Sequence, residues 1–309
     1  MSSDGAATVR CSAVSTVWQK LSPNMRGSLF MLCGAIAATL MFATVKALGG
    51  RFDSVQLVFI RGVVGVLMAA PFLARAGGRG FYTTRLGLEV GTGVLGAIAL
   101  ICTFFAIAHM ALADATAVLF TRPLFLLLLA MSFLGEAMRA GRWLATLLGF
   151  AGVLMIVKPA GVADLAALAV IAAALLSAVM VVFIKKMADT DGPDIQLFYF
   201  NLTMAMVLAV PMALTWITPG WLDCGLLLLT GLFGTLNAMF IVFAFRAGEA
   251  TAVSPVDYTR LIFAALLGFV LFSEIPDTWF WAGSATIVAA NLYIARNRPS
   301  RTLVADPPK

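Results

Sequence analysis

The chain has 309 residues, of which 61% are hydrophobic and only 12% charged. A soluble domain usually carries about a quarter charged residues, so this composition excludes a soluble globular protein built around one core. The net charge of +6 comes from basic residues that are scattered between apolar runs, and scattered charge excludes a nucleic-acid partner.

The sequence lacks the residue patterns that metal, redox, nucleotide-hydrolysing and Ser-His-Asp chemistry require. Cys11, Cys33, Cys102 and Cys224 have neither metal nor redox spacing, and His109 is the one histidine. The sequence contains neither a phosphate-binding loop nor a Ser-His-Asp set. We therefore expect no enzyme activity, no cofactor, no metal and no ATP motor, so that any transport would be secondary. The polar stretch 1–26 has no apolar core and does not fit a cleavable signal peptide.

Apolar runs follow one another along the chain with short polar breaks. About 20 apolar residues are needed to cross a bilayer as a helix. The sequence therefore predicts an all-α integral membrane protein with ten transmembrane helices. The runs are 27–48, 55–75, 86–108, 113–134, 141–159, 164–185, 195–216, 222–245, 250–273 and 278–295.

The positions of lysine and arginine predict the orientation. If the N-terminus is cytoplasmic, 15 of the 21 basic residues fall in cytoplasmic segments and only Arg51 and Lys158 fall in outer loops. The other four lie within or at the ends of helices: Lys46, Arg61, Arg122 and Arg260. This bias follows the positive-inside rule and supports an even number of spans. We expect a multi-pass protein of the inner membrane with both termini cytoplasmic.

The chain also repeats itself at an offset of about 138 residues. Residues 56–61 resemble 196–201, residues 115–118 resemble 250–253, residues 121–125 resemble 259–263, and residues 134–136 resemble 272–274. The ordered matches predict two five-helix repeats, 27–160 and 163–296, flanked by tails 1–26 and 297–309. Because five is odd, the second repeat is inverted, a plan common in secondary transporters. Two such halves can pack in two ways that open a central cavity to one side or the other.

These segments resemble the EamA-type branch of the drug/metabolite transporter superfamily. The resemblance is carried by residues 59–61, 111–117 with Arg122-Pro123, 134–136, 149–153, Lys158-Pro159, 247–252 and 272–274. It implies ten helices around a central cavity and, in most members, export driven by an ion or substrate gradient. Members move amino acids, cofactors, sugar compounds and other small solutes. One departure is that Leu261 stands where the first half has Pro123, with Pro255 six residues earlier, so helices 4 and 9 are expected to bend at different depths.

Charged residues inside spans are costly and tend to face protein or water. Asp257 and Arg260, spaced i,i+3, share one helix face and are either a structural pair or one that opens for a proton or substrate. Asp257 is the proton-coupling candidate. The candidate substrate-binding residues are Arg61, Arg122, Tyr199, Asn201, Asn237, Tyr258 and Arg260. Helix packing is the alternative role for the two asparagines, and Lys46 is expected to snorkel to the interface.

We expect Arg61, Arg122, Asp257 and Arg260 to converge on one cavity. Three arginines against one aspartate favour an anionic or zwitterionic substrate, because guanidinium groups suit carboxylate and phosphate. The sequence thus predicts a secondary transporter that exports a small polar metabolite, such as an amino acid, a carboxylate or a cofactor like riboflavin, by proton coupling or exchange. It would work as a monomer or homodimer in the lipid bilayer. The alternatives are a non-transporting receptor or assembly subunit, and an intramembrane lipid-modifying enzyme.

Overall fold

The computed structural model describes residues 21–75, 82–134, 140–157, 165–187 and 190–296. All regular structure within these ranges is helical, which confirms the predicted all-α class. The elements are α2 (Pro23–Leu48), α3 (Ser54–Arg75), α4 (Leu86–His109), α5 (Leu112–Leu119), α6 (Arg122–Leu134), α7 (Ala140–Val157), α8 (Leu165–Met187), α9 (Pro193–Leu214), α10 (Trp221–Ala247), α11 (Ala250–Val253), the 3-10 helix η2 (Ser254–Tyr258), α12 (Thr259–Phe272) and α13 (Thr278–Arg296).

Each of the ten predicted runs is helical in the described residues, but they differ in how well they could span a membrane. Eight spans are long and apolar enough to cross, with α5–α6 and η2–α12 each forming one of them. Helix α7 contributes a shorter apolar stretch, Trp143–Val157. α13 carries Ser284, Asn291 and two tryptophans, which lower its mean hydropathy. The protein is thus a multi-pass helical membrane protein.

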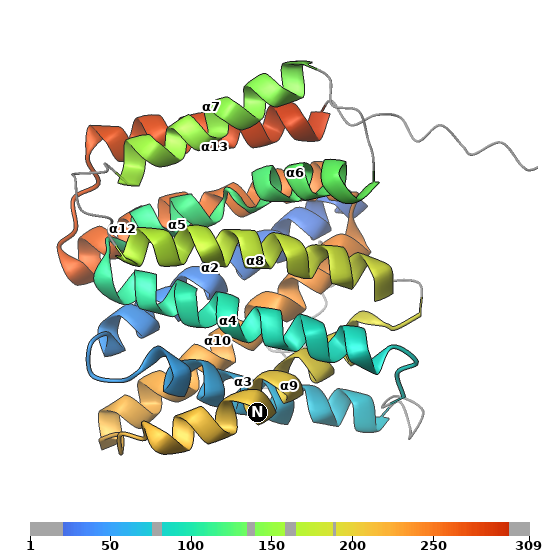
Figure 1. Cartoon of the computed structure of the whole chain (residues 1–309), viewed down its shortest axis with the longest axis vertical. Coiled ribbons are helices and arrows are strands. Elements are labelled where there is room, and N and C mark those ends of the chain that lie inside the picture. Colours follow the sequence, from blue (N-terminus) through green and yellow to red (C-terminus); the bar gives the residue numbers. More distant parts are fainter. Residues whose placement is uncertain (1–20, 76–81, 135–139, 158–164, 188–189, 297–309) are drawn as a thin grey trace, which may run out of the picture.

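The helices lie side by side, and the two ends of the molecule are each formed by a pair that is distant in sequence. Figure 1 shows α7 beside α13 at one end and α3 beside α9 at the other, with α2, α4, α8 and α10 between them. In the interior α2 packs on α10, and α4 packs on α8. Each of these pairs joins a helix before residue 158 to one after residue 164, so the main packing surface lies between the two parts of the chain.

Two of the helices are interrupted. α5 ends at Leu119 and α6 begins at Arg122, with Pro123 in its first turn, where a missing N–H costs little. In the second case Pro255 lies inside the 3-10 segment η2, after which α12 begins at Thr259. We expected the fourth and ninth predicted helices to bend at different depths. The two helices differ before their interruptions but not after them. α6 begins at Arg122 and α12 at Thr259, within one residue of the matching position. The irregular stretch of the second half begins earlier because Pro255 lies earlier.

The distance between α7 and α13 at their contact is set by backbone atoms rather than by side chains. A Cβ atom added to Gly283 would lie 2.6 Å from the carbonyl oxygen of Gly152, and one added to Gly152 would lie 2.8 Å from that of Gly283. Small residues allow membrane helices to approach this closely. Neither helix can give way without moving its axis.

We predict that Gly283→Ala lowers the free energy of unfolding by about 1–3 kcal/mol, the usual cost of overpacking a close contact. The matched control is Gly225→Ala in α10, where an added Cβ would meet nothing within 4 Å. Thermal unfolding of both purified variants, followed by size-exclusion chromatography in detergent, measures the effect. Equal melting temperatures for Gly283→Ala and the wild type would contradict the assigned contact.

Candidate functional site

An ion pair lies where the second interrupted helix resumes. Nη2 of Arg260 is 2.7 Å from Oδ1 of Asp257, and the side chains are only 16% and 22% exposed, respectively. The 3-10 turn that contains Asp257 and the first turn of α12 that contains Arg260 place the two groups on one face. Arg260 also lies over the ring of Phe120, with its Cζ 5.9 Å from the ring centroid. Its Nε is buried with no hydrogen-bond partner among the described residues.

The first interrupted helix brings a second guanidinium group to this ion pair. Arg122 is the first residue of α6, and it interacts electrostatically with Asp257, Arg260 and Tyr258. Its side chain is exposed rather than packed away. Three of the four charged residues that the sequence predicted to converge therefore lie together, and two positive groups face one negative group.

Aromatic side chains from both breaks meet at the same place. The rings of Phe120 and Tyr258, which correspond in the two repeats, have centroids 5.0 Å apart. The interruption after α5 exposes the Phe120 carbonyl, and Nδ2 of Asn291 in α13 donates to it at 2.8 Å. Asn291 also interacts with the Tyr258 side chain. Sequence reasoning missed Asn291, although an asparagine in an apolar helix is a signal that could have found it.

Arg61 contacts a different set of residues. It lies in α3, is 8% exposed, and has its Cζ 6.0 Å from the Phe200 ring centroid. Its Nη1 is 3.9 Å from the sulfur of Met204, and its Nε, which approaches Gly234 of α10, has no hydrogen-bond partner among the described residues. The convergence of Arg61 with the other three charges stays a prediction.

The remaining polar candidates differ in what surrounds them. Asn201 is buried in α9, donates to the Leu197 carbonyl at 2.7 Å and fills the space above Gly65 of α3, a geometry that favours helix packing. Asn237 in α10 has a buried Oδ1 without a hydrogen bond among the described residues. Tyr199 is half-buried, with its ring edge-on to Phe198 at 5.7 Å.

Lys46 does not snorkel as we expected. Its Nζ lies 2.5 Å from Oε1 of Glu274 and donates to the Met110 carbonyl at 2.6 Å, while the other Glu274 oxygen accepts from the Leu112 amide at 2.9 Å. An acid within reach is a better partner than the interface, because the pair cancels both charges. Lys46 and Glu274 lie at the C-terminal ends of the predicted runs 27–48 and 250–273. Both runs would cross the membrane in the same direction, and this is the signal that could have found the pair.

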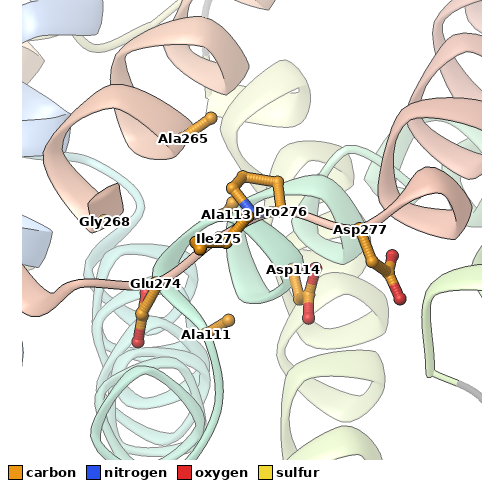
Figure 2. A pocket seen from close by; sticks show the side chains of 9 residues that line it. All are labelled: Ala111, Ala113, Asp114, Ala265, Gly268, Glu274, Ile275, Pro276 and Asp277. Atoms are coloured by element: carbon orange, nitrogen blue, oxygen red, sulfur yellow. The ribbon is translucent and has the colours of Figure 1, made fainter.

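The pocket beside this ion pair is not the predicted central cavity. It has a volume of about 120 Å³, smaller than typical metabolite sites, and none of the candidate site residues lines it. Figure 2 shows Ile275 and Pro276 passing over the start of α5, with Asp114, Glu274 and Asp277 around them. Within the described part of the chain, no three His, Cys, Asp or Glu side chains are grouped so that they could hold a metal ion.

Comparison with known proteins identifies the family. Residues 25–158 and 164–296 each match the EamA-like transporter family. The chain is 34% identical over 283 residues to the pseudopaline exporter CntI of Pseudomonas aeruginosa, in an alignment that covers 88% of this chain and 96% of that protein. It is 29% identical to the S-adenosylmethionine uptake transporter of Rickettsia prowazekii, with 89% and 94% covered.

Two further comparisons agree. The riboflavin transporter of Rhizobium johnstonii is 29% identical, with 89% of this chain and 92% of that protein covered. One protein of known crystal structure shares the fold with a TM-score of 0.60 at 18% identity, covering 87% of this chain and 96% of that one. The pseudopaline exporter, the S-adenosylmethionine uptake transporter and the riboflavin transporter are named as transporters and not as enzymes. The chain belongs to the EamA-like transporter family.

Proposed function

We propose that this protein is a secondary transporter that carries a small anionic or zwitterionic metabolite across the inner membrane by alternating access. The observation that carries the proposal is the cluster of Arg122, Asp257 and Arg260 between two interrupted helices. Two guanidinium groups against one carboxylate leave one positive charge. A carboxylate or phosphate group of the substrate would neutralise it in bidentate geometry.

The surroundings of the cluster suit an organic solute. Phe120 and Tyr258 supply aromatic faces beside the charges, and interrupted membrane helices commonly form transporter sites because their ends present unpaired backbone groups. Arg61, Tyr199 and Asn237 would extend the site toward α3, α9 and α10. Asn201 would act mainly by holding α9 against α3.

The packing of the helices supports two inverted repeats, 27–160 and 163–296, and ten transmembrane helices. If the repeats are exchanged, α2 on α10 becomes α8 on α4, and α3 on α10 becomes α9 on α4; all four contacts are present. The contacts α3–α9 and α7–α13 each join a helix to its counterpart in the other repeat, so the exchange leaves them unchanged. Such symmetry gives two near-equivalent packings, one open to each side. Both termini would be cytoplasmic, from the positive-inside bias.

Asp257 is the coupling residue that we propose within this cluster. A proton on its carboxylate would release Arg260 to the substrate, and loss of the proton would restore the ion pair. The relatives include an exporter and an uptake transporter, so the direction of transport would follow the imposed gradient. Their names suggest cofactor-like and amino-acid-derived solutes as the first compounds to assay.

Counterflow into proteoliposomes tests the proposed activity. The panel is labelled S-adenosylmethionine, riboflavin, amino acids and carboxylates, with and without a pH gradient. We expect flux of at least one solute, and we expect Arg122→Gln to reduce it by about tenfold or more, because one good charged contact contributes more than about 1.4 kcal/mol.

The matched control for this assay is Arg51→Gln, which removes an ion pair with Asp223 at 3.0 Å. Because the Arg51 side chain is 62% exposed and an exposed pair contributes only about 0–1 kcal/mol, this variant should transport normally. No flux of any solute from folded protein would contradict the proposed function. Normal flux through Arg122→Gln would remove the cluster from the substrate site.

A pair of variants separates a structural ion pair from a functional one. Asp257→Asn leaves two arginines without a counter-charge, so we predict a loss of about 2–3 kcal/mol of stability, somewhat below the cost of breaking a fully buried pair. Adding Arg260→Gln should restore the melting temperature. Transport should remain lost in the double variant. Recovery of gradient-driven flux together with stability would show that the pair only holds the helices.

A further inference from the structure

A second acidic group is buried in the membrane domain, and the proposed cycle does not use it. Glu89 lies in the first turn of α4 and is 0% exposed. Neither of its carboxylate oxygens has a hydrogen-bond partner among the described residues. An ionised carboxylate that is buried without a donor costs several kcal/mol, so this packing suits a carboxylic acid.

Among the described residues, the charged groups around Glu89 do not supply a counter-charge. Asp191, which is 4% exposed in the link between α8 and α9, adds a second negative charge that acts on Glu89. Its Oδ2 accepts a hydrogen bond from Thr83 at 2.9 Å. Arg85, one turn before Glu89, donates instead to the Lys186 carbonyl at 2.7 Å.

Two further charged side chains that the structure describes on the facing helices are directed to solvent. Lys186 at the end of α8 is exposed, and Asp194 at the start of α9 is exposed and lies 3.4 Å from Arg246 of α10. Within the described residues, the positive end of the α4 helix dipole is a favourable electrostatic partner, because Glu89 lies in the first turn of that helix. The α4 dipole only partly stabilises a negative charge on Glu89. Glu89 would therefore release its proton once water reaches the carboxylate.

We propose that Glu89 is a proton-binding site, which is occupied when α4 is closed against α8 and α9. α4 belongs to the first half of the chain, whereas α8 and α9 belong to the second, and both pack on α4. Separation of the halves would hydrate Glu89 and Asp191 together. The step is the transfer of one proton between the carboxylate and water, with no other reactant.

Proton binding at this interface links conformation to pH. A proton bound only in the closed packing stabilises that packing, and its loss favours the hydrated one. The inference rests on the proposed function where it makes this proton a coupling ion for transport. The binding of the proton can be measured without any substrate.

Infrared difference spectroscopy of the full chain in nanodiscs tests the site. Spectra recorded across the neutral pH range should contain a pH-dependent carbonyl band from a protonated carboxylic acid. We expect Glu89→Gln to lose this band and Glu89→Asp to keep it at a shifted frequency. The matched control is Glu249→Gln, which removes an exposed carboxyl group between α10 and α11 and should leave the band unchanged.

A spectrum of Glu89→Gln that matches the wild type would overturn the proposal. Loss of the band in Glu249→Gln but not in Glu89→Gln would also overturn it. The outcome of the transport assay is independent of the outcome of the infrared experiment. A band that depends on Glu89 without flux of any solute supports the proton site and contradicts the transporter. Flux with no such band supports the transporter and overturns the site.

Discussion

A charge or an unpaired backbone group cannot face the hydrocarbon core of a membrane without a large cost, and this constraint explains where the polar groups of the protein lie. Phe120 loses its regular helix bond, and the Asn291 amide replaces it. Arg260 pairs with the Asp257 carboxylate beside the same break, and Arg122 interacts electrostatically with that carboxylate. The two interrupted helices belong to different halves of the chain, so this charged cluster lies between the halves.

Several sets of charged groups lie across the boundary between the two halves. Lys46 and Glu274 meet at one end, Arg122 meets Asp257 and Arg260 at the breaks, and Glu89 faces Asp191 at the other end. Any movement of one half against the other must break, form or hydrate these contacts. That gives a physical reason for transport to respond to charge, whether on a proton or on a substrate.

Periodicity and charge bias were sufficient to predict the helices, because a continuous apolar run in lipid has few alternatives to a helix. The repeat also located both interruptions, through Pro123 and Pro255. Individual partners were harder. Lys46 was assigned to the interface because its acid, Glu274, is 228 residues away in sequence, and only the crossing of α2 and α12 joins them. The burial of Glu89 depends on how α8 and α9 pack against α4, which the sequence does not show. Asn291 was missed because its partner is a backbone carbonyl, which the sequence does not mark.

The most direct test of alternating access is whether the cluster can be reached from each side of the membrane. In a chain whose four native cysteines, Cys11, Cys33, Cys102 and Cys224, are replaced by serine, Phe120→Cys would be exposed to a membrane-impermeant maleimide in right-side-out and inverted vesicles. We expect modification from both sides, slowed by a transported solute, whereas Leu214→Cys at the exposed end of α9 should react from one side only. Modification of Phe120→Cys from a single side under every condition would contradict alternating access at this site.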